Sequence, residues 1–365
     1  YALMVVDSLL AQIENGRAGH SQGISMGLPK LEGIIDGVTR QTYSIVFGQS
    51  STGKTSLAIY AYVYRPCMEH LEDEDFHVIY YSLEISAELL MAKLLSIYIF
   101  EKYHVELSTK DILSRTKGGL LSDEYFHIVE ECIPWLRRIE SMITIFDGSL
   151  NAQTLYSTLV NELAKAGQFV EEEGRKKYIP NNPKQIVVVV IDHMNLLTHT
   201  MGRTIKQEID LASQQLVGLR NMCGISPVAI MQANRDSMSM SRRDMLGSGD
   251  CRISDIRDSA GPSQDAEIVI GIYNPFRDKI ANYRGYDIKQ LQDVFRSITV
   301  LKNRYGESEV ADCICFYGKI GMFVEPPTPD KIYDYSKFQS PLWTLEPKQD
   351  EEDEDDKPKT LNFTL

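Results

Sequence analysis

Apolar residues fall into short strand-like runs separated by longer helix-like segments along most of the chain. The strand-like runs are TYSIVF (42–47), HVIYYSL (77–83), QIVVVVI (185–191), SPVAIM (226–231), EIVIGIY (267–273), SITVLKN (297–303) and ADCICFY (311–317). Helical spacing of apolar residues covers 57–71 and 87–103. Strands that alternate with helices predict parallel β–α–β units, which bind ligands at the carboxyl ends of the strands. We therefore expect one α/β domain over residues 28–330.

The first 14 residues predict an amphipathic helix. Its apolar stripe at helical spacing consists of Leu3, Val6, Leu9, Leu10 and Ile13. Residues 15–27 are rich in Gly, Ser and His, which indicates a flexible linker. Because a single short helix cannot bury its own stripe, we expect residues 1–14 to dock on the same domain or on a neighbouring subunit.

The composition is typical of a soluble protein from a reducing compartment. The chain has 365 residues, and no apolar run approaches the ~20 residues of a membrane span, so we expect no membrane partner. Its six cysteines are scattered and form no Cys-x-x-Cys pair. We therefore expect buried, reduced thiols and a cytoplasmic protein.

Negative charge is concentrated near the end of the sequence. Residues 346–359 hold eight acidic residues and three lysines, a net of −5, and the remainder of the chain carries −8 of the total of −13. A run of like charges favours an extended segment, so we expect residues 331–365 to form a C-terminal extension with a disordered acidic tail. The tail either keeps the protein soluble without binding anything, binds a partner through its apolar tip, or competes with a polyanionic ligand for a binding surface of the chain.

A phosphate-binding motif lies between the first strand-like run and the following helix. Residues 48–55, GQSSTGKT, fit G-x-x-x-x-G-K-[ST] in the structural context that the motif requires. Its backbone N–H groups can surround phosphates, Lys54 can reach the β- and γ-phosphates, and Thr55 can ligate Mg²⁺. The residues that we expect to bind a nucleoside triphosphate are Gly48, Ser50, Ser51, Thr52, Gly53, Lys54, Thr55 and Ser56.

Three polar side chains stand where other strand-like runs end. Asp192 follows a doubly buried run and suits Mg²⁺ held through water. Glu84 is placed to orient and deprotonate an attacking water, and Gln232 is placed to sense the γ-phosphate. Spacing alone leaves ordinary alternatives open: a capping aspartate, a helix-initiating glutamate and a solvated loop glutamine.

Cations gather in two later segments. The loop 235–257 holds five arginines against four aspartates, which suits a backbone phosphate, although internal ion pairs are the alternative. Lys302 and Arg304 lie two residues apart on one face of a late strand. They fit a pair that reaches the γ-phosphate of a neighbouring subunit, and ordinary surface cations are the alternative.

Taken in order, six segments resemble the ATPase domain of replicative ring helicases of the DnaB type. They are GLPKLEGIIDGV, YYSLEIS, VIDHMNLL, MQANR, ISDIRDSAGPSQDAEIVIGIY and LKNRYG. The first resembles the family's entry segment. The others resemble its S-L-E-M, I-D-Y-L-Q-L, S-Q-L-N/S-R, S-D-L-R-E-S-G-x-I-E-Q-D-A-D and A-K-Q-R-N-G elements, and the match extends over roughly residues 1–325.

The resemblance implies a RecA-like P-loop NTPase core with a mostly parallel sheet, preceded by a linker helix. It further implies a homo-hexameric ring with ATP and Mg²⁺ at each interface and single-stranded DNA through the centre. The implied activity is an ATP-dependent replicative DNA helicase that moves 5′–3′. Its implied partners are primase, a helicase loader and other replisome proteins.

The resemblance also assigns roles to individual residues. Glu84 becomes the general base, Gln232 the γ-phosphate sensor, and Arg304 with Lys302 the pair that acts on the neighbouring subunit. The implied DNA contacts are Arg235, Arg257, Asp258 and Ala260.

The chain departs from the family pattern at several positions. His193 and Asn195 replace the usual Tyr and Gln, Asp258 replaces Glu, and residues 260–262 (AGP) replace a simple Gly turn. These departures concern the DNA loop and its surroundings and leave the ATPase motifs intact.

Two other functions fit parts of the sequence. A RadA-like branch-migration translocase has a K-N-R-F-G element similar to residues 302–306, but segment 257–266 and the absence of a four-Cys zinc motif favour the helicase. A non-catalytic ATP-binding ring scaffold would need a broken Lys54 or Glu84, and both are intact.

Overall fold

The computed structural model describes residues 23–345 except 116, 118, 173, 235–249, 258 and 259. It also describes positions 6, 10, 13, 14, 16 and 17, all of which are helical. Residues 346–365, with the predicted acidic tail, lie outside the described residues.

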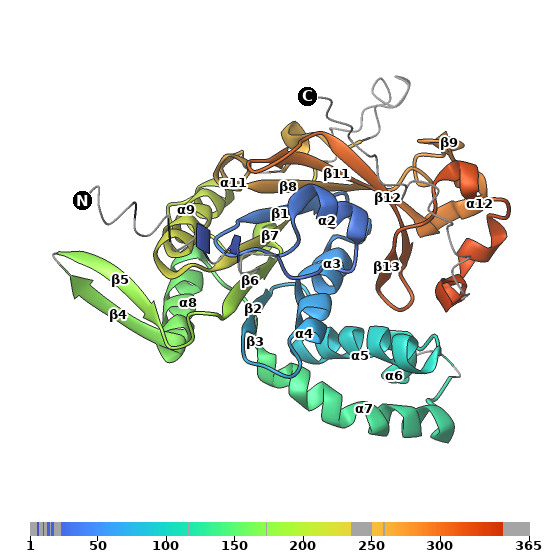
Figure 1. Cartoon of the computed structure of the whole chain (residues 1–365), viewed down its shortest axis with the longest axis horizontal. Helices are drawn as coiled ribbons and strands as arrows, with labels where there is room; N and C mark the ends of the chain where they lie inside the picture. The colour runs from blue at the N-terminus through green and yellow to red at the C-terminus, as the bar shows by residue number, and fades with distance from the viewer. Residues whose placement is uncertain are drawn as a thin grey trace, which may run out of the picture.

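A large, mostly parallel sheet runs through the centre of the described chain (Figure 1). Its nine strands have the order β13-β12-β11-β8-β1-β7-β6-β2-β3, and the six from β8 to β3 are parallel. These six are β1 (Ser44–Gly48), β2 (Phe76–Ser82), β3 (Ile143–Asp147), β6 (Ile186–Asp192), β7 (Ser226–Gln232) and β8 (Ile268–Tyr273). The antiparallel strands are β11 (Phe295–Asn303), β12 (Val310–Tyr317) and β13 (Met322–Val324).

Helices cover both faces of the sheet. One face packs against α2 (Pro29–Ile35), α3 (Lys54–Ala58), the π-helical stretch η1 (Ile59–Tyr64), α4 (Arg65–Glu69), α5 (Ala87–Tyr103) and α7 (Asp123–Met142). The other face packs against α8 (Ala152–Ala166), α9 (Ile205–Cys223) and the short α11 (Gly261–Asp265). Smaller elements are α6 (Thr109–Ile112), the hairpin β4 (Gly167–Glu172) and β5 (Arg175–Pro180), β9 (Asn282–Tyr283), β10 (Tyr286–Asp287) and α12 (Ile288–Leu291).

The continuous apolar runs in the sequence arise because both faces of the central strands are buried. Val188 and Val190 of β6 belong to the core on the α5 side, whereas Val189 and Ile191 belong to the core on the α9 side. Successive side chains of a strand point to opposite faces, so a strand covered on both sides is apolar at every position.

The α/β class and every strand named from the sequence are confirmed, with ends that differ by a few residues. The helix over 87–103 is confirmed as α5. The helix expected over 57–71 begins earlier, at Lys54, and passes through a π-helical stretch before it ends at Glu69. Neither β3 nor the β4–β5 hairpin was predicted from the sequence.

The packed domain extends past both expected boundaries. Ile24 and Met26, in the expected flexible linker, are buried, and Ile24 pairs with Val38 in a β-bridge. In the expected C-terminal extension, Phe338 is fully buried and Trp343 packs against it. The segments at 23–27 and 331–345 therefore pack against the domain and contribute buried side chains to its core.

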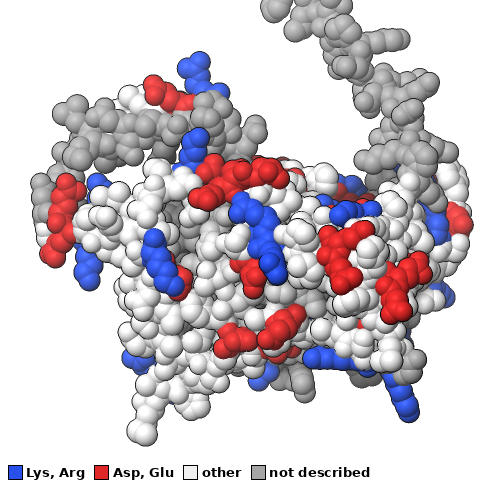
Figure 2. Space-filling model, turned by 90° about the horizontal axis from the view of Figure 1, so that it is seen from below, with Lys and Arg blue, Asp and Glu red and all other residues white. Residues whose placement is uncertain are grey.

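All six cysteines are free of disulfides, and four of them are buried. No described helix combines the length and the apolar character that crossing a bilayer requires. Acidic and basic side chains are interspersed over the described part of the face in Figure 2, which views the molecule from below. The negative charge of the protein therefore does not gather into one patch on that face.

Candidate functional site

The register of the sheet brings the predicted site residues to one edge. Ser82 of β2 lies beside Asp192 of β6, and Gly48 of β1 lies beside Gln232 of β7. Glu84 follows two residues after Ser82. Because these strands are parallel, their carboxyl ends meet, and the phosphate-binding loop shares this edge with all three strand-end residues.

Both glycines of the phosphate-binding loop are required by the backbone. A Cβ at Gly48 would lie 2.5 Å from the carbonyl oxygen of Ile272 on β8. Gly53 has a φ of +106°, and a Cβ there would lie 3.0 Å from the ring of Phe316. Glycine alone adopts such a conformation without strain. The loop can therefore turn sharply from β1 into α3, which begins at Lys54.

Lys54 lies against the loop that precedes it. Its Nζ donates a hydrogen bond to the carbonyl oxygen of Gln49 at 2.6 Å, and the side chain is almost fully buried. Burial lowers the pKa of Lys54 to about 8, and the nearby carboxylates of Glu84 and Asp192 act in the opposite direction. The ammonium is thus held in a poorly solvated position, where an anionic ligand would stabilise its charge.

Asp192 is fully buried and accepts two hydroxyl hydrogen bonds. Thr55 Oγ1 donates to Oδ1 and Tyr80 OH donates to Oδ2, each at 2.9 Å. Burial raises the pKa of Asp192 to about 6, although both hydroxyls lower it. A desolvated carboxylate beside a threonine hydroxyl is a hard oxygen donor set, which fits Mg²⁺. Thr55 and Asp192 therefore suit the metal that the sequence predicts.

A cavity of about 340 Å³ opens beside the loop. Its lining residues are Ser50, Ser51, Gly53, Lys54, Thr55, Ser56, Glu84, His193, Gln232 and Phe316. Most of the residues predicted to bind or hydrolyse a nucleotide therefore lie around one space. Gly48, Thr52 and Asp192 are buried and are not among the lining residues, and Thr52 Oγ1 donates to the Gln49 carbonyl at 2.9 Å.

Glu84 and Gln232 approach the cavity from opposite sides of the loop after β6. Glu84 is about half exposed, with Oε2 3.9 Å from Nε2 of His193. Gln232 Nε2 donates to Ser50 Oγ of the phosphate-binding loop at 2.5 Å. The exposed carboxylate can accept a proton from water, and the amide links β7 directly to the phosphate-binding loop.

Two arginines that support the loop were missed in the sequence. Arg296 of β11 is almost fully buried, and its Nε donates to the carbonyl oxygen of Thr52 at 2.8 Å. Its guanidinium lies over the ring of Phe316, and burial lowers its pKa to about 10. Arg277 donates to the carbonyl oxygen of Ser50 at 2.8 Å. The available signal for Arg296 was a charged residue between Phe295 and the strand-like run 297–303.

Residues 23–325 of the chain match the family described as the DnaB-like helicase C terminal domain. The chain belongs to this family. It is 27% identical over 268 residues to the replicative DNA helicase DnaB of Helicobacter pylori (strain ATCC 700392 / 26695), covering 72% of this chain and 46% of that protein. It is 24% identical over 273 residues to the DnaB of Buchnera aphidicola subsp. Acyrthosiphon pisum (strain APS), covering 74% and 50%. The chain thus spans about half the length of the curated relatives it matches.

Two solved structures share the fold. One describes a DnaB-like replicative helicase and its interactions with primase, with a TM-score of 0.65, 19% identity, and coverage of 88% of this chain and 66% of that chain. The other is described as an ATPase domain, with a TM-score of 0.64, 19% identity, and coverage of 88% and 99%. The predicted resemblance and the RecA-like fold class are therefore confirmed.

Lys302 and Arg304, which the DnaB resemblance assigns to a neighbouring subunit, do not line the cavity of their own chain. Lys302 Nζ donates to the carbonyl oxygens of Ser263 and Gln264 at 2.8 and 2.9 Å. Arg304 also donates to the Gln264 carbonyl, at 2.9 Å, and pairs with Glu267 at 3.0 Å. The two cations thus share one side of β11, at the end of α11, and their role on another subunit stays a prediction.

The implied DNA contacts divide between described and undescribed residues. Arg257 and Ala260 are exposed, and Ala260 immediately precedes α11. Arg235 and Asp258 lie outside the described residues. Arg257 is joined to the nucleotide site through its backbone, because its N–H donates to the carbonyl oxygen of Gln232 at 2.9 Å.

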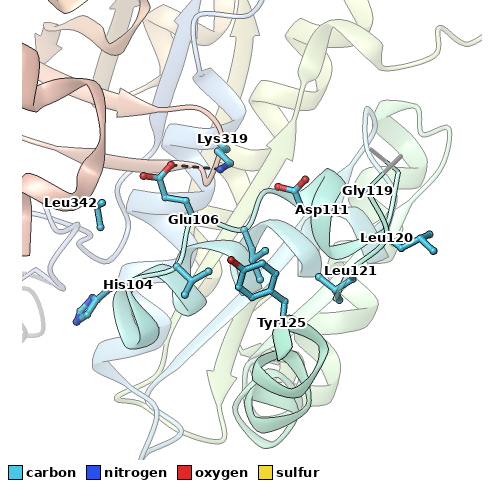
Figure 3. A pocket seen from close by; sticks show the side chains of 11 residues that line it. His104, Glu106, Asp111, Gly119, Leu120, Leu121, Tyr125, Lys319 and Leu342 are labelled. Carbon is cyan, nitrogen blue, oxygen red and sulfur yellow. Dashed lines mark ion pairs between the residues drawn. The ribbon is translucent and has the colours of Figure 1, made fainter. Parts of the chain in front are cut away.

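A larger cavity, of about 550 Å³, lies away from all of the predicted site residues (Figure 3). It is bounded by the α5–α6 connection, the start of α7, Lys319 and Leu342, and Lys319 pairs with Glu106 at 3.8 Å. Leu120 at its rim is 87% exposed. This cavity is lined by both polar and apolar side chains, and none of them belongs to the nucleotide site.

Proposed function

We propose that this chain is the motor domain of an ATP-driven replicative DNA helicase. One observation carries the proposal: Lys54, Thr55, Glu84 and Gln232 line a single cavity in a chain of the DnaB-like family. Binding groups, a metal-ligand candidate, a general-base candidate and a γ-phosphate sensor are the parts that ATP hydrolysis needs in one place.

Each of these residues has a separate role in the proposed binding and hydrolysis of ATP. Lys54 binds the β- and γ-phosphate oxygens, and Glu84 takes the proton of the attacking water. Thr55 and Asp192 would hold Mg²⁺, which neutralises phosphate charge when it is bound. Gln232 reports the occupancy of the γ-phosphate position through its contact with Ser50.

The proposal includes a homo-hexameric ring around single-stranded DNA, with 5′–3′ movement. Lys302 and Arg304 would complete the site of an adjacent subunit. The N-terminal helix supports subunit contacts, since Val6, Leu10 and Ile13 share one helical face and are 48–53% exposed. Primase, a helicase loader and other replisome proteins are the proposed partners, in the cytoplasm.

Strand displacement tests the proposed function. The protein is mixed with a forked DNA duplex labelled on one strand, in the presence of ATP and Mg²⁺, and release of the labelled strand is followed. We expect release that requires ATP and that Lys54→Ala abolishes. An ATP-binding scaffold would bind nucleotide without turnover, and a branch-migration translocase would act on branched junctions and leave the fork intact.

A further inference from the structure

The turn after β6 lies between the nucleotide site and the segment that carries Arg257. This turn, the 3₁₀ element η2 (Met194–Leu196), follows Asp192 and His193 directly. Its middle residue, Asn195, is partly buried and stands at the ends of β6 and β7. Asn195 is also, with His193, one of the two positions in VIDHMNLL where the chain departs from the family pattern.

Asn195 closes a cycle of three hydrogen bonds with Gln232 and Arg257. The backbone N–H of Gln232 donates to Asn195 Oδ1 at 2.8 Å. Asn195 Nδ2 donates to the carbonyl oxygen of Arg257 at 3.5 Å. The backbone N–H of Arg257 in turn donates to the carbonyl oxygen of Gln232 at 2.9 Å.

The chemistry of the cycle requires a side-chain amide. The N–H of Gln232 can only donate, so it fixes the Asn195 oxygen on its side and directs the NH₂ group toward the Arg257 carbonyl. A carboxylate could accept from Gln232 but could not donate to a carbonyl, and an aliphatic side chain could do neither. The side-chain amide of Asn195 thus provides the acceptor for the Gln232 N–H and the donor for the Arg257 carbonyl.

The cycle connects two functional elements. On one side, the Gln232 side chain contacts Ser50 in the phosphate-binding loop. On the other side, exposed Arg257 leads toward Ala260 and the start of α11. Further backbone contacts run alongside, because Ala233 pairs with Ile256 in a β-bridge. A shift of Gln232 toward or away from Ser50 would therefore move the backbone at Arg257.

We propose that Asn195 is a positioning residue that couples the nucleotide site to the DNA-contacting segment at Arg257. The inference rests on the proposed function, in which Gln232 senses the γ-phosphate and Arg257 contacts DNA. Coupling between two binding sites is reciprocal, so the same residue should transmit the effect of DNA on nucleotide affinity and that of nucleotide on DNA affinity. The response of ATP turnover to DNA is a separate, kinetic readout of the same connection.

The test compares Asn195→Ala and Asn195→Asp with the unmodified chain. Two ratios are measured: ATP turnover with saturating oligo-dT over turnover without it, and oligo-dT affinity with over without a non-hydrolysable ATP analogue. Losing one or two neutral hydrogen bonds should lower both ratios by about 2–10-fold. Asn195→Asp keeps the size of the side chain and the acceptor to Gln232, removes the donor to Arg257 and adds one negative charge, whereas Asn195→Ala removes both hydrogen bonds without adding charge.

Leu196→Ala is the matched control, because Leu196 is the exposed neighbour in the same turn. It should leave both ratios within about twofold. Thermal unfolding midpoints show whether each variant is folded. Full coupling in folded Asn195→Asp and Asn195→Ala would overturn this inference alone. An unmodified chain whose turnover ignores oligo-dT would overturn the proposed function together with the inference.

Discussion

Individual residues at this site derive their properties from burial. Lys54 and Asp192 carry opposite charges, yet each is desolvated, so burial disfavours the charged form of both. The residue types and their spacing identified Lys54 and Asp192 in the sequence. How deeply each side chain is buried depends on the residues that pack around it in the fold. His193, which follows β6, comes within 3.9 Å of Glu84 because β2 and β6 are adjacent in the sheet.

Glu84→Gln and Lys54→Ala should separate hydrolysis from binding. Glu84→Gln keeps the size of the side chain but cannot accept a proton, so ATP turnover should fall by about 10²–10⁴-fold while nucleotide still binds. Lys54→Ala should lose nucleotide binding. Steady-state turnover and titration with a fluorescent ATP analogue measure the two effects. Normal turnover in Glu84→Gln would remove Glu84 from the mechanism.

The lowered pKa of Lys54 predicts that nucleotide affinity weakens as the pH rises. The ammonium is charged below a pKa of about 8 and becomes neutral above it, and only the charged form attracts phosphate. The dissociation constant of an ATP analogue should therefore increase from about pH 7.5 to about pH 9.5. Lys54→Arg, which stays charged throughout, is the control and should show little pH dependence. An equally flat profile in both proteins would contradict this role of Lys54.

At the scale of elements, the sequence predicts the strands that end at the nucleotide site better than it predicts the peripheral strands. β1, β6 and β7 are buried on both faces, so their apolar runs stand out whatever lies beside them. β3 is an edge strand of five residues, mostly half-buried, and its pattern is weak. The β4–β5 hairpin carries charged residues, and it relies on Phe169 and Tyr178 packing against each other.

Site residues that follow the ends of strands could be predicted from the sequence. Site residues whose position depends on the order of strands in the sheet could not. Glu84, Asp192 and Gln232 each follow an apolar run, and a parallel sheet brings such ends to one edge. Arg296 of β11 donates to the Thr52 carbonyl of the phosphate-binding loop. In the sheet, β11 is separated from β7 by β8 and β1, and no local sequence pattern predicts the contact.

Arg296→Met tests whether β11 supports the phosphate-binding loop. The substitution leaves the buried carbonyl oxygen of Thr52 without its donor from Arg296, so the free energy of unfolding should fall by about 1–3 kcal/mol. Urea unfolding measures the loss. Arg277→Met removes a more exposed arginine that contacts the same loop; it is the control and should cost less. Unfolding midpoints that match the unmodified protein would show that the Arg296 contact does not stabilise the loop.

At the scale of the whole molecule, we expect active sites to be shared between subunits. Lys302 and Arg304 lie at the end of α11 and do not line the cavity of their own chain, which fits the proposed role at the site of another copy. We propose that the nucleotide binds at the carboxyl ends of the central strands β1, β7 and β6, in a sheet that has helices on both faces (Figure 1).

Mixing two inactive variants tests the shared site. Arg304→Ala should lose about 10³–10⁵-fold in turnover, as removal of an arginine finger does, and Lys54→Ala should be inactive. Mixed rings should regain activity, because some interfaces combine an intact Lys54 with an intact Arg304. Glu84→Gln mixed with Lys54→Ala is the control without rescue, since both defects lie in the same half of the site. Mixtures that never exceed the sum of their parts would confine the site to one subunit.

The central claim is that this chain hydrolyses ATP in response to single-stranded DNA. The measurement that tests it most directly is the ATP turnover of the protein with Mg²⁺, with and without oligo-dT, beside Glu84→Gln under the same conditions. We predict turnover that rises with oligo-dT in the unmodified protein and that is nearly absent in Glu84→Gln. Bound ATP that is not hydrolysed, or turnover that is indifferent to oligo-dT, would contradict the claim.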